Sequence, residues 1–251
     1  MSSSIWMLCA GDSELRALRL SPWRAVEAQH QVSTRKLVDS TEEQILLEEM
    51  IDRVKPPDLT GGRLHYLLFT PFRYPPLAHG SRFGGRHDRG IWYGSIELRS
   101  AFAEVAYYRF LFLEGSHAQL GTVMTSLTAF TATIRTTRGI DLTRPPFDKY
   151  RAKIASPVRY DATQQLGADM RAAQVDAFCY PSARDAEGGI NVAAFVPSVF
   201  GNAKPRLFET WYCSASRQRV DVTQGDYFAR RRFSFERAQF LVNETLPSPA
   251  I

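Results

Sequence analysis

Three side chains, Arg82, Tyr93 and Glu104, follow one another at intervals of eleven residues in a stretch rich in glycine. An arginine fork binds a phosphate group through two hydrogen bonds at once. A tyrosine ring stacks on another aromatic ring, and a carboxylate accepts hydrogen bonds from sugar hydroxyls and stabilises positive charge at an anomeric carbon. Together these residue types favour a ligand that combines a phosphate, a sugar and an aromatic ring.

A second arginine and two glycines support this interpretation. Arg73 and Tyr74 precede Arg82 in a turn-rich segment, so two guanidinium groups can converge on one phosphate or pyrophosphate. Gly84 and Gly85 allow the backbone to approach a ligand closely. Each residue alone also fits an ordinary role, as a solvated loop arginine, a core tyrosine or a surface glutamate.

The first part of the chain, residues 1–58, is predicted to form an N-terminal helical extension, with the catalytic domain over residues 59–251. The clearest helix there is STEEQILLEEMIDRVKPPD, in which Thr41 and Gln44 form a capping box and the two prolines end the helix. Its apolar stripe contains Ile45, Leu46 and Met50. We expect this extension to pack on the catalytic core or to contact a protein partner.

The rest of the chain predicts a mixed α+β fold with a largely antiparallel sheet. The segments RLHYLLFT and GIWYGS are typical of strands. Ser95 or Ser100 can cap the helix that follows, and Glu104 lies at the margin of its apolar stripe. No G-x-G-x-x-G motif opens a helix after a strand, which argues against a doubly wound nucleotide-binding sheet. Further strands are predicted at residues 125–137, 176–181, 190–196, 208–216 and 217–223, and helices at 161–174 and 235–241.

Composition narrows the possible functions. The chain has 31 Lys and Arg residues against 26 Asp and Glu, a formal net charge of +5, and most of its basic residues are arginine. This bias suits an anionic ligand. An alternative to such a small ligand is nucleic acid, bound by a basic module without catalysis. The small net charge and the lack of a recognition motif argue against this alternative. The basic run at residues 229–237 is predicted to be a solvated face.

Cysteine, histidine and apolar patterns add three expectations. Cys9, Cys179 and Cys213 lack the paired spacing of disulfide frameworks or zinc sites. The five histidines form no pair at helical ligand spacing, so no metal is expected. The apolar run at residues 5–10 is too short for a membrane span or a signal-peptide core, so we expect a soluble cytoplasmic protein without a membrane partner.

The ordered motifs resemble a known family. GSRF, the tyrosine of IWYGS and the helix AFAEVAYYR are similar to the RES domain of bacterial toxin–antitoxin systems, which is named for its arginine, glutamate and serine. The segment CYPSARDAEGGINVAAFVP resembles the part of that family around its serine, here Ser182, followed by Asn191 and Val192. The resemblance covers roughly residues 60–200.

The resemblance implies a fold similar to the diphtheria-toxin-like ADP-ribosyltransferases and an activity that consumes NAD as substrate. Members of the family cleave NAD at its nicotinamide bond with water or phosphate, or transfer ADP-ribose to a protein target. A cognate antitoxin protein is the implied partner. Carried over to this sequence, the catalytic residues are Glu104, Arg82 and Tyr93, and the NAD-binding residues are Arg73, Tyr74, Arg82, Phe83, Tyr93 and Ser182.

Two alternatives stay open at the arginines. A second GGR motif ends at Arg86, which competes with Arg82 for the phosphate-binding role. Arg63 is a possible substitute for Arg73. The acceptor of ADP-ribose, any protein target and the oligomeric state are also left open by the sequence.

Overall fold

A single ten-stranded sheet organises the residues that this computed structural model describes, which are 4–28, 38–54, 56, 62–74, 76, 79–118, 120–225 and 231–248. The strands are β1 (Arg16–Leu20), β2 (Trp23–Glu27), β3 (Trp92–Ser95), β4 (Val123–Thr131), β5 (Ile134–Asp141), β6 (Ala177–Pro181), β7 (Ile190–Ala194), β8 (Arg206–Ala215), β9 (Arg219–Gln224) and β10 (Arg232–Glu236). They lie in the order β1-β5-β6-β7-β3-β2-β4-β8-β9-β10, and only β5 and β6 pair in parallel among them. The prediction of a mixed α+β fold with a largely antiparallel sheet is confirmed.

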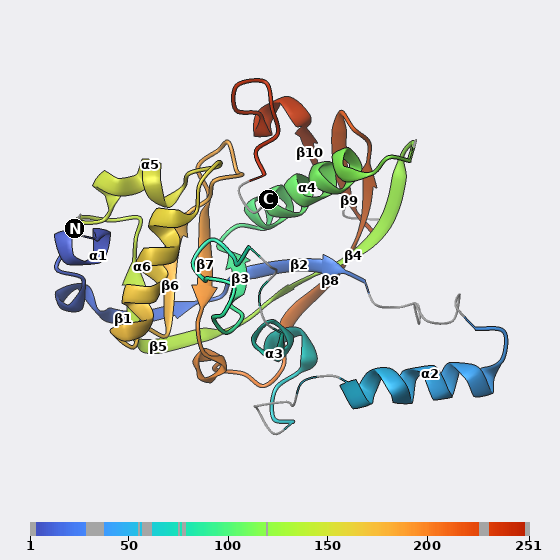
Figure 1. Ribbon diagram of the computed structural model, residues 1–251, viewed down its shortest axis with the longest axis horizontal. Helices are drawn as coiled ribbons and strands as arrows, with labels where there is room; N and C mark the ends of the chain where they lie inside the picture. The colour runs from blue at the N-terminus through green and yellow to red at the C-terminus, as the bar shows by residue number, and fades with distance from the viewer. Residues whose placement is uncertain are drawn as a thin grey trace.

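Helices cover the sheet in separate groups. The α-helices are α1 (Ile5–Leu8), α2 (Thr41–Val54), α3 (Tyr66–Arg73), α4 (Leu98–Gly115), α5 (Arg151–Ile154) and α6 (Asp161–Ala172), and short 3-10 turns include η4 (Pro197–Val199) and η5 (Arg237–Phe240). Figure 1 shows α4 along the half of the sheet that contains β2, β4 and β8, and α5 and α6 beside β6 in the other half. None of the helices in the described part of the chain is long and apolar enough to cross a membrane.

Alternation along β7 distributes its side chains between two cores. Successive residues of a strand point to opposite faces of a sheet. Val192 therefore packs in the cluster that contains Leu68 of α3, whereas Ala193 packs in the cluster that contains Leu166 of α6. Asn191, two residues before Ala193, lies on the same face as Ala193, which is the face that α4 and α6 cover.

Helix α4 is anchored by aromatic packing. Phe102 and Phe110 are fully buried and belong to the same cluster as Trp211 and Phe235 from strands β8 and β10. The rings of Phe102 and Trp211 lie 4.8 Å apart in an edge-to-face arrangement. Burial of each such side chain stabilises the fold by about 2 kcal/mol. The backbone of α4 is therefore held firmly against the sheet.

The expectation of a helical N-terminal extension is wrong for residues 16–27. Strand β1 pairs with β5 at one edge of the sheet, and β2 lies near its middle, between β3 and β4. These strands are short, and their register is decided by pairing with β4 and β5, about a hundred residues away in the chain. Local pattern alone carries little information about such long-range pairing.

The segment RLHYLLFT was predicted to be a strand and instead forms most of α3. The His65 side chain caps the helix by accepting a hydrogen bond from the Leu67 amide. Leu68 and Phe72, four residues apart, are buried against the sheet. A short, continuous apolar run fits a buried strand or a buried helix equally well, because its periodicity does not distinguish them.

Helix α2 was predicted correctly over residues 41–54, but its capping box begins one residue earlier. Ser40 Oγ accepts from the Glu43 amide at 3.1 Å, and the Glu43 carboxylate accepts from the Ser40 amide at 3.4 Å. The reciprocal pair replaces the expected box of Thr41 and Gln44. The stripe of Ile45, Leu46 and Met50 is exposed, and α2 stands away from the sheet in Figure 1.

Later segments agree with the predicted elements except in two places. Helix α6 and strands β3 and β6 to β9 lie where the sequence indicated. The segment 125–137 contains two strands, β4 and β5, with Ala132 and Thr133 between them. The segment 235–241 contains the end of β10 and the single turn η5, not an α-helix.

Candidate active site

The sheet opens between β2 and β3. Strand β2 pairs with β4 along its whole length, but it pairs with β3 only where Trp23 meets Ser95. Beyond that point the two strands diverge, and the Arg24 guanidinium bridges the gap by donating to the Tyr93 carbonyl oxygen at 2.6 Å. Gly94 permits the close approach at the narrow end, because a Cβ there would lie 2.7 Å from the Trp23 carbonyl oxygen.

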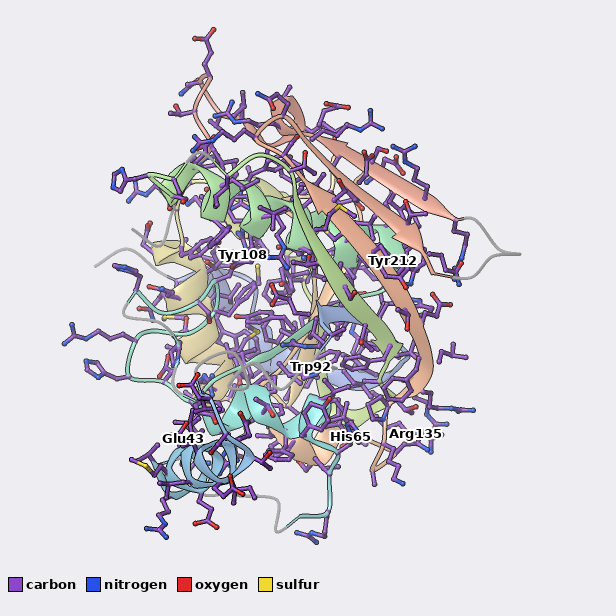
Figure 2. All side chains as sticks on the ribbon, turned by 90° about the vertical axis from the view of Figure 1, so that its right-hand side faces the viewer. Glu43, His65, Trp92, Tyr108, Arg135 and Tyr212 are labelled. Atoms are coloured by element: carbon purple, nitrogen blue, oxygen red, sulfur yellow. The ribbon has the colours of Figure 1, made fainter. Side chains whose placement is uncertain are left out.

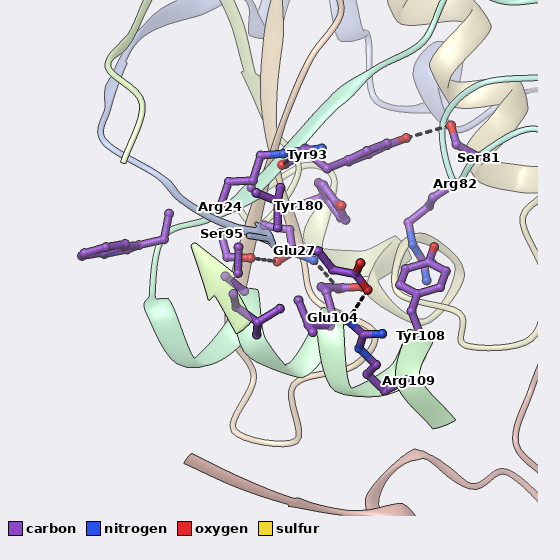
Figure 3. Close-up of a pocket in the computed structure, with 18 of the residues that line it drawn as sticks. Arg24, Glu27, Ser81, Arg82, Tyr93, Ser95, Glu104, Tyr108, Arg109 and Tyr180 are labelled. Atoms are coloured by element: carbon purple, nitrogen blue, oxygen red, sulfur yellow. Dashed lines mark hydrogen bonds and ion pairs between the residues drawn. The ribbon is translucent and has the colours of Figure 1, made fainter. Parts of the chain in front are cut away.

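A cavity of about 430 Å³ occupies this opening (Figure 3). Strand β2 forms one wall and α4 forms another, and the loop after α3 closes a third side. The side chains of Arg82, Tyr93 and Glu104 all line it, although they come from a loop, a strand and a helix. The structure therefore brings together the three residues whose spacing first indicated a site.

Hydrogen bonds fix the Glu104 carboxylate in this wall. Its Oε1 atom accepts from Asn191 Nδ2 at 2.7 Å and from Ser182 Oγ at 3.2 Å. Asn191 is held in turn, because its Oδ1 accepts from Ser95 Oγ at 2.7 Å. Ser182 Oγ also accepts from the amides of Arg184 and Asp185. The carboxylate is thus oriented before any ligand arrives.

Arg82 reaches the cavity because its loop is clamped onto α6. Gln164 Nε2 donates to the Ser81 carbonyl oxygen at 3.1 Å, and a Cβ on Gly167 would lie 2.0 Å from the Phe83 carbonyl oxygen. Arg82 as a whole residue is 9% exposed; its guanidinium donates to the carbonyl oxygens of Ile154 and Ser156 and lies 4.6 Å from the centre of the Tyr160 ring. Those contacts stiffen the arginine at the cavity wall.

Tyr93 is held by its hydroxyl. The Tyr93 and Ser81 hydroxyls are 2.9 Å apart, and the Phe83 amide donates to the Tyr93 oxygen at 3.4 Å. Burial is the main cause that raises the pKa of Tyr93 to about 12, and its hydrogen bonds with Ser81 and Phe83 oppose that shift. Tyr93 therefore stays a neutral phenol throughout the physiological range.

This raised pKa predicts a loss of stability in alkali. The unfolded phenol ionises near pH 10, and the folded one near pH 12, so the stabilisation from neutral Tyr93 is complete below pH 10 and is lost as the pH rises to 12. We expect the wild type to lose more free energy of unfolding than Tyr93→Phe over this interval, as measured by urea denaturation at each pH. A difference that stays constant from pH 9 to 12 would contradict the assignment.

Arg24 is a site residue that the sequence analysis missed. It lines the cavity from β2, stacks over the Trp92 ring at 5.5 Å, and bonds to Tyr93. Burial lowers the pKa of Arg24 to about 10, so it remains charged at neutral pH. Figure 2 places Trp92 deep inside the molecule, and it is fully buried. The segment WRAVE alternates between apolar and polar residues only over Trp23, Arg24 and Ala25, which is a weak signal for a strand.

A second cavity of about 930 Å³ adjoins the first. The two share Arg24 and Tyr93 among other residues, so they form neighbouring parts of one hollow. Arg73 and Tyr74 line only the second part, where Arg73 also donates through Nε to the Pro56 carbonyl oxygen. The predicted pair is therefore next to the Glu104 cavity and not within it.

Two predicted ligand-binding residues have other positions. The Phe83 side chain is fully buried between Phe178 and Tyr180, with ring centroids 4.7 and 4.8 Å away, so it anchors the loop and lines neither of the two cavities. Ser182 is buried behind Glu104 and outside the cavity lining, so its contact is with the carboxylate. The serine was expected to line the pocket, but the fold turns it toward Glu104.

The two alternative arginines lie away from the hollow. Arg86 is exposed, and its Nε donates to the neighbouring His87 ring at 2.7 Å. Arg63 is exposed as well, and neither residue lines the first or the second cavity. Of the four candidate arginines, Arg82 lines the first part of the hollow and Arg73 the second.

The cavity wall also contains an ion pair. Glu27 of β2 and Arg109 of α4 form an ion pair at the wall, which neutralises both charges. Within the described residues, no group of three or more His, Cys, Asp and Glu side chains could hold a metal ion. Cys9, Cys179 and Cys213 are buried free thiols, and burial raises the pKa of Cys179 to about 12.

Comparison with protein families matches residues 55–218 to the RES domain. No curated protein matches the chain. The matched region contains Arg82, Tyr93, Glu104 and Ser182. It begins after β2 in the chain, so it does not include Arg24. The RES domain is associated with toxin–antitoxin systems and with NAD. Because the match spans more than half of the sequence, and the site residues lie within it, this chain belongs to the RES domain family.

Proposed function

We propose that this chain cleaves NAD at the bond between nicotinamide and ribose, and that its sheet is of the ADP-ribosyltransferase-like type. The observation that carries the proposal is the fixed Glu104 carboxylate in a cavity with Arg24, Arg82 and Tyr93. The other carboxylate of the cavity, Glu27, is neutralised by its ion pair. Glu104 is therefore the carboxylate that we assign to the reacting sugar.

The chemistry needs only one such carboxylate. When the bond breaks, its electron pair stays with the nicotinamide nitrogen, which changes from a cationic pyridinium to a neutral leaving group. No strong general acid is required for that departure. Positive charge moves to the anomeric carbon, where a preoriented carboxylate lowers the barrier. Oε1 of Glu104 accepts both hydrogen bonds from the protein, which leaves Oε2 for the ribose.

The remaining side chains would orient the dinucleotide. Arg24 and Arg82 would hold the pyrophosphate, and Tyr93 would stack on nicotinamide. Arg73 and Tyr74 would contact the adenosine half in the second part of the hollow. The two volumes, about 430 and 930 Å³, are of the size of small-molecule sites. Such positioning contributes to the rate because the reacting groups no longer need to be brought together.

The acceptor and the partners follow from the same chemistry. Water, phosphate or a side chain of a target protein adds to the anomeric carbon and gives up its proton. Uncontrolled loss of NAD is harmful to the cell that makes the enzyme, so we propose that a cognate antitoxin protein binds and inhibits this chain. Proteins with RES domains pair with antitoxins in toxin–antitoxin systems, which supports this partner.

One assay tests the activity and identifies the acceptor. Purified chain is incubated with NAD, and nicotinamide release is measured by liquid chromatography without phosphate, with phosphate, and with cell extract. We expect nicotinamide in each case. It should be accompanied by ADP-ribose when water is the acceptor, by the phosphate ester of ADP-ribose when phosphate is, or by an ADP-ribosylated protein when a protein in the extract is. Absence of nicotinamide in all three conditions would refute the proposal.

The nucleic-acid alternative gains no support from the basic run at residues 229–237. Arg231 pairs with Glu209 at 2.7 Å, and Arg232 pairs with Asp221 at 3.0 Å. Arg237 pairs with a carboxylate of α4. The described arginines of this run are therefore neutralised within the protein, whereas residues 229 and 230 lie outside the described part of the chain.

A further inference from the structure

A third cavity of about 540 Å³ lies beside α3. It shares no residue with the Glu104 cavity, and with the second cavity it shares only Phe69 and Arg73 of α3. Its walls come from α3, from the end of α6 and from the segment that leads into η4. The residues are Phe69, Phe72, Arg73, Arg89, Arg171, Gln174, Val175, Asp176, Phe195, Val196 and Pro197.

The charges in this cavity are unbalanced. Arg73, Arg89 and Arg171 line it against one carboxylate, Asp176. None of the three arginines forms an ion pair with a described carboxylate, and Asp176 accepts its hydrogen bond from Thr136 Oγ1 at 2.6 Å. Several other described arginines pair with a nearby Asp or Glu, as Arg231 does with Glu209.

The arginines keep donors available. Arg171 Nη2 donates to the Arg89 carbonyl oxygen at 2.8 Å, which leaves its Nη1 without a partner in the described structure. The Arg89 side chain is exposed and makes no hydrogen bond to the described residues. An arginine with free N–H groups is suited to bind a phosphate oxygen pair. The cavity therefore offers an anion both charge and hydrogen bonds.

The other walls are flat and apolar. The Arg171 guanidinium lies 4.2 Å from the centre of the Phe195 ring, which orients it by cation–π contact. Phe69 is half-buried and contributes a further ring, Phe72 is only 8% exposed, and the half-buried Val196 and Pro197 complete the apolar surface. An aromatic ring of a ligand would be buried there while its charged end meets the arginines. The volume lies in the range typical of small-molecule sites.

We infer that this cavity binds a small aromatic phosphate, separately from the Glu104 site. Arg89 and Arg171 bind the phosphate group, and Phe69, Val196 and Pro197 pack against the aromatic part. Arg73 stands in the wall between this cavity and the second one, so an occupied third cavity has direct contact with the larger hollow. The inference does not depend on NAD cleavage, because it uses residues that the Glu104 site does not contain.

Calorimetric titration of the full chain with three matched probes tests the inference. The probes are phenyl phosphate, inorganic phosphate and phenol. We expect phenyl phosphate to bind at least tenfold more tightly than either of the others, since only it engages both the arginines and the rings. If inorganic phosphate bound equally well, the cavity would bind anions without using its apolar wall. If phenol bound equally well, the arginines would contribute nothing to the affinity. Either result would contradict the inference.

Two variants locate the binding. Arg89 lines the third cavity and neither of the other two, so Arg89→Ala is expected to weaken the binding of phenyl phosphate about ten- to hundredfold. Arg24→Ala changes only the first two cavities and is expected to leave that affinity unchanged. Arg171→Lys, which keeps the charge and loses the fork, should weaken binding as well, and circular dichroism checks that each variant folds. No measurable binding by the wild type, or loss of binding in Arg24→Ala alone, would overturn the inference.

Discussion

The Glu104→Gln protein is expected to release nicotinamide from NAD about a thousandfold more slowly than the wild type. Glutamine has nearly the same shape, so Ser182 and Asn191 can still bond to its oxygen. It lacks the negative charge that stabilises the anomeric carbon as nicotinamide leaves. Affinity for NAD should change little, because the arginines to which we assign the phosphate groups are unaffected, so the loss is expected in kcat.

Glu97→Gln is the matched control for this experiment. Glu97 is exposed at the start of the same helix and lies outside the cavity. The control should retain wild-type activity, and both variants should keep the wild-type melting temperature. If the wild type cleaves NAD and a folded Glu104→Gln protein does so at the same rate, the catalytic role of Glu104 is wrong.

The Arg24→Ala protein is expected to show a KM for NAD that is about ten- to hundredfold higher. A hydrogen bond to a charged group contributes roughly 1.5 to 3 kcal/mol, and Arg24 is the cationic side chain that β2 adds to the cavity of Arg82. The variant also loses the hydrogen bond to the Tyr93 carbonyl oxygen, which widens the gap between β2 and β3. Initial rates across a series of NAD concentrations measure the effect.

Two further variants serve as controls for Arg24→Ala, namely Arg19→Ala and Arg24→Lys. Arg19 is exposed on β1, away from the cavity, so its removal tests whether the loss of any arginine weakens binding. Arg24→Lys keeps the charge and loses the fork, so an intermediate KM is expected. An unchanged KM in Arg24→Ala would show that β2 walls the cavity without binding the substrate.

The candidate site was predicted in part because its residues share a local pattern. Arg82, Tyr93 and Glu104 lie within one stretch, in which a loop, a strand and a helix follow directly in the chain. Short connections between successive elements keep such residues close in space. Local pattern also predicted α6 and most of the later strands, since their apolar periodicity matches the faces that they bury.

Arg24 illustrates what local pattern leaves out. It precedes Glu104 by eighty residues in the sequence, and it reaches the cavity only because β2 lies between β3 and β4. The predicted ligand contacts of Phe83 and Ser182 differ from their observed positions for the same reason. Phe83 and Ser182 have side chains that fit a ligand pocket by type, but their neighbours in the folded chain are Phe178, Tyr180 and Glu104.

Residue types at short range were enough to indicate the class of the fold and the family, and they singled out three candidate side chains that line one cavity. Only the folded chain shows which strand completes the cavity, which oxygen of Glu104 has no hydrogen-bond partner among the described residues, and which arginines line the same cavity as Glu104. Those properties depend on pairing between segments that are distant in the chain, and the free energy of such pairing comes from packing and hydrogen bonds that form only when the whole sheet is assembled.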